Sequence, residues 1–145
     1  MVFDTNVLVH AADRHSEFGP RCRQRVDQAK NGPEPAFLTW SVCYEFLRVS
    51  THPRVFRSPW NAATSYDFIA GLLSSSGFQI LADTPRHSTV LSQTLSELPD
   101  LRGSVMHDLH TAVLMRENGI SRICTRDSDF RRFPFLTVID PLDAS

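Results

Sequence analysis

The sequence predicts one α/β domain over residues 1–145, a three-layer α/β/α sandwich around a central, mostly parallel sheet. Short apolar runs alternate with segments of helical periodicity, which is the pattern of α/β proteins. The helical segments can carry the chain back from one strand to a parallel neighbour. No internal repeat, low-complexity tract or linker divides the chain, and 145 residues suffice for a single hydrophobic core.

Five short apolar runs are predicted to form the strands of the sheet. In chain order they cover residues 1–3, 36–40, 78–81, 120–125 and 133–139. Residues 126–129 are expected to form a turn. In sheets of this kind, functional side chains gather at the carboxyl ends of the strands.

Six helices are predicted from apolar spacing and from signals at their ends. The first begins near residue 7, and the others cover residues 17–30, 42–50, 59–73, 84–98 and 106–118. Asn31-Gly32-Pro33 and Asn118-Gly119 are strong C-terminal signals, and Thr84-Pro85 is a cap followed by a first-turn proline. Ser41 is the expected N-cap of the third helix, so Glu45 occupies the capping-box position or the next one.

The composition excludes several classes of protein. A content of 41% hydrophobic and 21% charged residues is ordinary for a soluble globular protein. No apolar run approaches the roughly 20 residues that span a bilayer. The N-terminus lacks the basic and apolar regions of a signal peptide, so we expect a cytoplasmic protein. The 3 cysteines are far apart and lack CxxC spacing, which favours reduced, partly buried thiols over disulfides or a zinc site.

The net charge of −1 neither favours nor opposes binding to nucleic acid. Lys30 is the only lysine among the 15 basic residues. Arginine suits bidentate contacts with phosphate, although a codon bias would produce the same excess. Two interpretations therefore stay open for Arg54, Arg57, Arg131 and Arg132: contact with RNA phosphates, or solvation of loops.

Four acidic residues are predicted to meet at one edge of the sheet. Asp4 directly follows the first strand, and Asp127 comes two residues after the fourth. Glu45 lies one turn into the helix after the second strand, and Asp108 lies in the first turn of the helix before the fourth strand. Taken singly, each has an ordinary role as a helix cap, a first-turn acid or a turn former.

On a common rim the four carboxylates would repel one another, which raises their pKa values unless a cation neutralises them. Mg²⁺ and Mn²⁺ are hard cations that prefer oxygen ligands. Such a site can activate water and stabilise the transition state of phosphodiester hydrolysis, with one ion or with two.

Three segments resemble motifs of the PIN domain family, in the family's order: Phe3-Asp4-Thr5-Asn6-Val7-Leu8-Val9, His107-Asp108-Leu109-His110-Thr111-Ala112 and Cys124-Thr125-Arg126-Asp127-Ser128-Asp129-Phe130. A lone glutamate after the second strand, Glu45, also matches. More narrowly, the chain is similar to the VapC toxins of bacterial type II toxin–antitoxin pairs. Two further segments are similar to the actinobacterial branch of these toxins: Thr84-Pro85-Arg86-His87 and Phe133-Pro134-Phe135-Leu136. The resemblance extends over residues 1–141.

The resemblance implies a metal-dependent endoribonuclease. Several positions match residues that bind Mg²⁺ or Mn²⁺ in the family, namely Asp4, Glu45, Asp108 and Asp127, with Asp129 as an additional acid. Asn6 matches a polar residue beside the first aspartate. Thr125 matches a hydroxyl at the strand end that can hydrogen-bond a carboxylate or a substrate phosphate. The implied reaction is hydrolysis of RNA by a metal-activated water, without a covalent enzyme intermediate.

The resemblance also implies a homodimer that inhibits translation and growth until a cognate VapB-like antitoxin wraps the toxin and plugs its pocket. Phe68, Ile69, Leu72 and Leu73 lie on one predicted helix, which could serve an interface or belong to the core. The RNA target stays open, because target choice depends on surface shape and loop charge rather than on the acids.

Two other functions are compatible with the pattern, a metal-dependent phosphatase on a similar scaffold and a binding module without activity. His107-Asp108 resembles the pair of the HD phosphohydrolases, but that family is all-helical and requires further histidines. We therefore expect His107 and His110 to be structural or at the surface. Asp4-Thr5-Asn6 resembles the opening of haloacid-dehalogenase phosphatases, but Asn6 replaces their general acid. A group of aromatic residues is expected in the core rather than in base stacking: Phe37, Trp40, Phe68 and Phe78.

Overall fold

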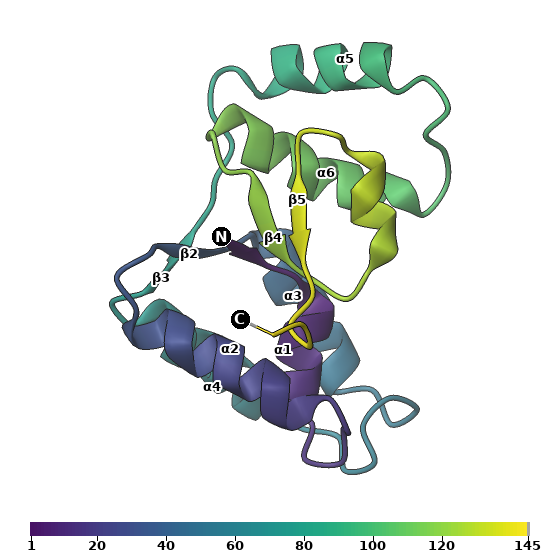
Figure 1. Cartoon of the computed structure of the whole chain (residues 1–145). Helices are drawn as coiled ribbons and strands as arrows, with labels where there is room; N and C mark the ends of the chain where they lie inside the picture. The colour runs from purple at the N-terminus through teal and green to yellow at the C-terminus, as the bar shows by residue number, and fades with distance from the viewer. Residues whose placement is uncertain (145) are drawn as a thin grey trace.

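The computed structural model describes residues 1–144 and confirms the predicted fold class (Figure 1). Five short strands form one sheet: β1 (Val2–Phe3), β2 (Ala36–Leu38), β3 (Phe78–Ile80), β4 (Arg122–Cys124) and β5 (Thr137–Ile139). Their order across the sheet is β3-β2-β1-β4-β5, and all neighbouring strands are parallel. β1 is therefore the central strand. The chain first adds β2 and β3 on one side of it and later adds β4 and β5 on the other.

Helices connect the strands as the alternating pattern predicts. Within the described residues there are six α-helices and one 3₁₀-helix: α1 (Thr5–Ala12), α2 (Gly19–Asn31), α3 (Trp40–Ser50), α4 (Ala62–Leu73), α5 (His87–Glu97), α6 (Val105–Glu117) and η1 (Ser128–Arg132). The same residues include no helix that is long and apolar enough to cross a membrane.

Side chains along the strands alternate between two hydrophobic clusters, one on each face of the sheet. Val2 and Ile123 pack into a cluster formed with α5, α6 and η1. Their neighbours Phe3 and Cys124 pack into the cluster formed with α1, α2, α3 and α4. This alternation follows from the two-residue period of a strand. Figure 1 shows α5 and α6 on one side of the sheet and α2 and α4 on the other.

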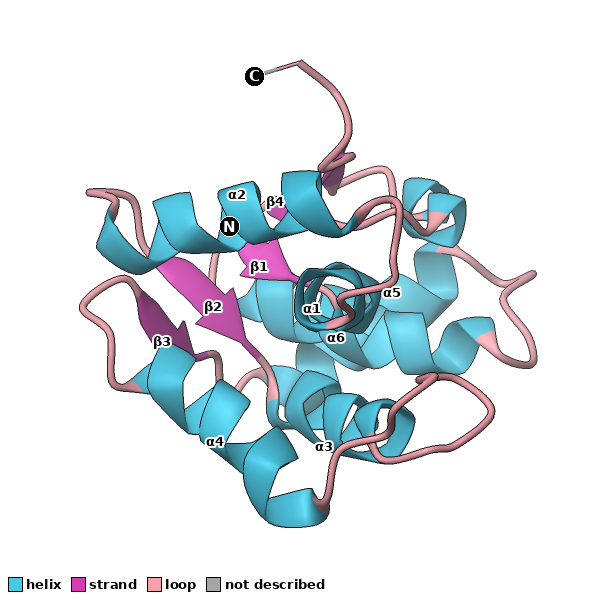
Figure 2. Ribbon diagram, turned by 90° about the horizontal axis from the view of Figure 1, so that it is seen from below, coloured by secondary structure: helices cyan, strands magenta, loops and turns pink. Residues whose placement is uncertain are grey.

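The carboxyl end of β1 leads directly into α1. Phe3 pairs with Cys124 of β4, and the Asp4 N–H donates to the Cys124 carbonyl oxygen at 3.0 Å, so the ladder continues one residue beyond the strand. Figure 2 shows α1 end-on just beyond the tip of β1. The backbone of Asp4 is thereby held next to Cys124, the last residue of β4.

The cap of α3 differs from the prediction. Thr39, not Ser41, is the N-cap, and its hydroxyl accepts the Val42 N–H at 3.1 Å. The helix begins at Trp40, directly after β2. Glu45 consequently lies a full turn beyond the capping-box position, so the expectation of a capping-box role for Glu45 is wrong.

The prediction that Trp40 belongs to the core is also wrong, because its side chain is 51% exposed. Once α3 begins at Trp40, the positions that face the sheet are Val42, Cys43 and Phe46, and Trp40 falls on the opposite face. The other three aromatic predictions hold, since Phe78 is buried and the partly buried Phe37 and Phe68 pack against the core clusters.

The helix considered for an interface belongs to the core. Ile69 and Leu72 of α4 are buried, and Phe68 and Leu73 pack against the same cluster. α4 contacts α3 and β3. Two of the four residues are thus buried, and the other two are partly buried against the core.

The last two strands are shorter than predicted, β4 covering Arg122–Cys124 and β5 covering Thr137–Ile139. Before β5, η1 replaces the expected simple turn, and Phe130 and Phe133 from this segment pack into the second cluster. Residues 133–136 therefore do not belong to the strand. The cysteine prediction is confirmed, since all three thiols are free and buried: Cys22, Cys43 and Cys124.

Candidate metal centre

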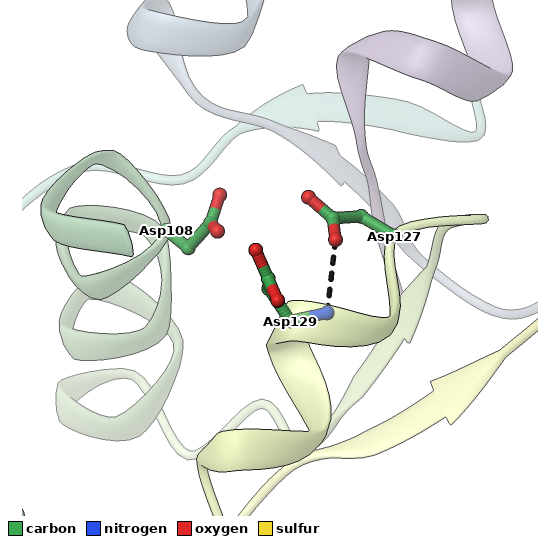
Figure 3. Close-up of side chains that lie close together, drawn as sticks. All are labelled: Asp108, Asp127 and Asp129. Atoms are coloured by element: carbon green, nitrogen blue, oxygen red, sulfur yellow. Dashed lines mark hydrogen bonds between the residues drawn. The ribbon is translucent and has the colours of Figure 1, made fainter. Parts of the chain in front are cut away.

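Three aspartates converge beyond the carboxyl ends of β1 and β4 (Figure 3). Asp108, Asp127 and Asp129 each offer one carboxylate oxygen, and these oxygens lie within 4.8 Å of one another. Asp108 comes from the first turn of α6, whereas the other two begin η1. The Asp129 N–H donates to the Asp127 carboxylate at 2.9 Å, which fixes the two acids relative to each other. An all-oxygen set of this kind fits the ligand preference of Mg²⁺ or Mn²⁺.

Asp4 lies at the end of β1 and caps α1. Its Oδ1 accepts the Thr5 N–H at 2.8 Å. Its Oδ2 accepts the Thr125 hydroxyl at 2.7 Å and the Asn6 side-chain amide at 2.8 Å. The carboxylate is therefore held in one orientation by three donors.

Thr125 connects Asp4 to the segment that carries Asp127. Its buried hydroxyl donates to Asp4, which is 121 residues away in the chain. The same oxygen accepts the Asn6 amide at 3.0 Å and the Asp127 N–H at 2.9 Å. Asn6 in turn accepts the Arg126 N–H at 3.1 Å. These bonds set the position of Asp4 relative to Asp127.

Glu45 approaches the centre from α3. Its carboxylate accepts the Thr5 hydroxyl at 3.3 Å and lies 3.6 Å from the Arg48 guanidinium. Asp4, Glu45 and Asp108 line two adjoining cavities of about 250 and 400 Å³. Asp127 also lines the smaller cavity.

The carboxylates oppose one another's ionisation. Burial, followed by the negative charges of the surrounding acids, raises the pKa of Asp108 to about 7. The acids that contribute are Asp127, Asp4, Asp129 and Glu45. Burial also raises the pKa of Asp4, against the hydrogen bonds from Thr125 and Thr5. A bound cation would relieve both effects.

All five predicted acids thus lie at the same edge of the sheet, but only three of them form a close group. Asp108, Asp127 and Asp129 form the tight group, so the residue ranked as additional in the sequence stands among the closest three. Asp4 connects to them through Thr125, and Glu45 connects to Asp4 through Thr5. Their roles as ligands stay predictions.

Sequence reasoning missed several residues beside the acids. Ser41, Tyr44 and Arg48 line the larger cavity with Glu45, and their spacing of three, four and seven residues on α3 is the signal that could have revealed them. His107 lines the same cavity. His107 and His110 are both exposed, in agreement with the prediction. A group of basic loop residues is exposed, with both interpretations still open: Arg54, Arg57, Arg131 and Arg132.

Comparison with known proteins identifies the family. The family model described as the PIN domain matches residues 1–136. The ribonuclease VapC48 of Mycobacterium tuberculosis is 31% identical over 96% of this chain and 95% of its own length. The ribonuclease VapC43 of the same organism is 32% identical over 97% of this chain and 94% of its own length. Both relatives are mycobacterial, in line with the resemblance to the actinobacterial branch.

Solved structures with the same fold are more distant in sequence. VapBC2 from Rickettsia felis, bound to a promoter DNA fragment, gives a TM-score of 0.67 at 17% identity and covers 96% of this chain and 98% of that one. VapC20 of Mycobacterium tuberculosis, described as a sarcin–ricin loop cleaving toxin, gives a TM-score of 0.61 at 17% identity, with 90% and 93% coverage. This chain belongs to the PIN domain family and, within it, to the VapC type.

Proposed function

We propose that this protein is a Mg²⁺- or Mn²⁺-dependent endoribonuclease and the toxin of a VapBC-type pair. The observation that carries the proposal is the convergence of Asp108, Asp127 and Asp129 at the edge where Asp4 and Glu45 also lie. The names of the relatives support the substrate, since VapC48 and VapC43 are named ribonucleases and VapC20 is described as cleaving the sarcin–ricin loop.

In this proposal Asp4, Glu45, Asp108 and Asp127 hold the ion, with Asp129 as an additional ligand beside Asp108 and Asp127. When bound, the ion supplies water activation and charge stabilisation for phosphodiester hydrolysis. Thr125 and Asn6 orient Asp4 through the hydrogen bonds described above, so the protein holds its ligands in place before substrate arrives.

The proposed partners follow from the type. A VapB-like antitoxin is proposed to plug the pocket and to release the inhibition of translation and growth, and VapBC complexes are among the structures with this fold. We also propose a homodimer. Because the apolar residues of α4 pack against the core, exposed side chains elsewhere, such as Leu95 and Met106, are better candidates for its interface. The proposed substrate and antitoxin both require a cytoplasmic location.

A direct test gives the purified protein Mn²⁺ together with a short RNA and, separately, a generic phosphomonoester. The proposal expects RNA cleavage that disappears with EDTA and an untouched monoester. Cleavage of the monoester with intact RNA would instead support the phosphatase alternative.

A test in cells expresses the chain without antitoxin. Asp4→Asn and Asp127→Asn are expected to abolish growth inhibition, because each removes a negative charge from the proposed metal centre. The asparagine in Asp127→Asn can still accept the Asp129 N–H through its side-chain oxygen. Asp67→Asn is the matched control, since Asp67 is an exposed acid on α4 outside the candidate centre. Variants at Asp4 and Asp127 that inhibit growth as strongly as the parent would favour a binding module without activity.

A further inference from the structure

The larger of the two cavities extends from the acids along the outer face of α3. Its volume of about 400 Å³ falls in the range of pockets that hold small ligands. Asp4, Glu45 and Asp108 form one wall, and Ser41 and Tyr44 are among the residues that continue it. Whatever occupies this cavity therefore lies directly beside the candidate metal centre.

Tyr44 presents an open aromatic ring to this cavity. The residue is 70% exposed, the largest fraction among the exposed large apolar or aromatic residues of the described chain. Within residues 1–144 no other aromatic ring packs against it. A nucleic-acid base stacks on such a ring with a free energy of about 1–3 kcal/mol.

Arg48 adds a positive charge to the lining of this cavity. It follows Tyr44 by four residues, so the two side chains share one face of α3. Its guanidinium lies 3.6 Å from the Glu45 carboxylate, and the side chain is 68% exposed. A phosphate that approaches the acidic wall is repelled by it, and Arg48 is positioned to offset this repulsion.

A hydroxyl completes the polar lining. The Ser41 Oγ lies one turn before Glu45 and 3.0 Å from the His110 Nδ1, which restricts its orientation. A fixed hydroxyl at this place can bond to a ribose hydroxyl or a phosphate oxygen.

We propose that this cavity is a nucleotide subsite, in which Tyr44 stacks on an unpaired base while Arg48 contacts the phosphate next to the scissile bond. The inference rests on the proposed ribonuclease function and adds to it the two side chains that hold the substrate. A base that stacks on Tyr44 has to be unpaired, because paired bases in a duplex are stacked on one another and do not reach the ring.

A second copy of the chain is the rival occupant of this face. Trp40 lies one turn before Tyr44, is 51% exposed and is not part of the cavity lining. The mixture of Arg48 with carboxylates around Tyr44 favours RNA, because the centres of subunit interfaces are depleted in charged residues. Trp40 consequently serves to separate the two occupants.

The experiment measures binding of a short fluorescein-labelled single-stranded RNA by fluorescence anisotropy. Ca²⁺ replaces Mg²⁺ and Mn²⁺ so that binding is measured without cleavage, and the RNA is checked afterwards to be intact. Tyr44→Ala is expected to weaken binding about 10-fold, the ratio that about 1.4 kcal/mol of lost stacking produces. Tyr44→Phe should bind like the parent, since it keeps the ring. Tyr66→Ala is the matched control, because Tyr66 is 53% exposed on α4, away from the cavity. Arg48→Ala should weaken binding and reduce its salt dependence, with Arg48→Lys retaining both.

Three outcomes overturn the subsite. If Tyr44→Ala binds as tightly as the parent, the ring contacts no base, while RNA cleavage by the parent would leave the proposed function intact. If the same RNA annealed to its complement binds equally well and suffers the same loss, no unpaired base is recognised. If Tyr44→Ala and Trp40→Ala both turn a dimer into a monomer by light scattering, the face is a subunit interface. A parent that binds through Tyr44 but never cleaves with Mn²⁺ would contradict the ribonuclease function alone.

Discussion

Helix α6 carries an acid at each end, and the two have opposite environments. Asp108 lies in the first turn and Glu117 in the last, nine residues or about 14 Å apart. The Glu117 carboxylate is fully buried and accepts hydrogen bonds from the Thr84 N–H and the His87 Nδ1. Asp108 faces other carboxylates, and within residues 1–144 no hydrogen bond or ion pair reaches its side chain.

The difference between Asp108 and Glu117 shows that burial alone does not distinguish a functional acid. Glu117 is the more deeply buried of the two, yet its neighbours satisfy it, so it fastens the start of α5 to α6. Asp108 has no such partner among the described residues, and its carboxylate lies among other carboxylates. A cation that binds there would supply the opposite charge.

The largest expected difference between the two ends is in catalysis. Asp108→Asn and Asp127→Asn should each lower the rate of RNA cleavage at least about 100-fold, because each removes a charge that holds the ion, and several kcal/mol of transition-state stabilisation depend on that ion. Glu117→Gln should cleave at nearly the parental rate. Initial rates on one RNA oligonucleotide in Mn²⁺ compare the three variants, and an equal loss in Glu117→Gln would remove the distinction.

The next difference is in the response to the ion. Addition of Mg²⁺ or Mn²⁺ at about 100 times the dissociation constant should raise the free energy of unfolding of the parent by about 2.7 kcal/mol. Asp127→Asn should lose most of this gain, whereas Glu117→Gln should keep it. Thermal melts with and without the ion provide the measurement. A gain that survives in Asp127→Asn would place the ion elsewhere.

A loss of intrinsic stability should occur at the other end of the helix. Glu117→Ala leaves the Thr84 N–H without its acceptor, which costs about 1–3 kcal/mol of unfolding free energy. Glu117→Gln should be milder, since its carbonyl still accepts that bond. Denaturant unfolding in EDTA measures the free energy of unfolding of both Glu117 variants. Asp108→Ala is the control and should lose less unfolding free energy than Glu117→Ala. If Asp108→Ala were the more destabilised variant, Asp108 would be a structural residue.

The smallest expected effect is a pH dependence of stability at the Asp108 end. Between the ordinary pKa of 3.8 and about 7, the folded chain keeps the Asp108 proton that the unfolded chain has lost. Stability therefore falls as the pH rises through this window. Asp108→Asn removes the effect.

In EDTA at pH 8 this variant should be more stable than the parent by about 1 kcal/mol, a value discounted because the carboxyl is only half-buried. The corresponding rise in Tm is about 2–4 °C, and at pH 4 the two proteins should melt together. The same difference at both pH values would show that carboxylate repulsion is not its cause.

The sequence was sufficient to place most of the acids because strand ends are local signals. Asp4 and Asp127 each follow an apolar run closely, and parallel strands bring such positions to one edge. The position of the Asp129 carboxylate within 4.8 Å of Asp108 could not be predicted, because it depends on the path of η1.

Other features depend on details that periodicity does not contain. A shift of the α3 cap by two residues, from Ser41 to Thr39, starts the helix at Trp40 and places that side chain outside the core. The bond between His87 and Glu117 joins residues 30 positions apart on two helices, and nothing in the segment that contains His87 indicates its partner. Pairings of this kind arise from the packing of helices and are visible only in the structure.

The central position of β1 has a consequence for the order of events during synthesis. β1 and Asp4 are synthesised before β4 and before two of the three clustered aspartates, which lie after residue 121. A nascent chain that has not yet released this later segment from the ribosome contains no complete acidic group, whatever else has folded. If the proposed activity is correct, it therefore appears only when this segment has emerged and folded against β1, and not in proportion to the length synthesised.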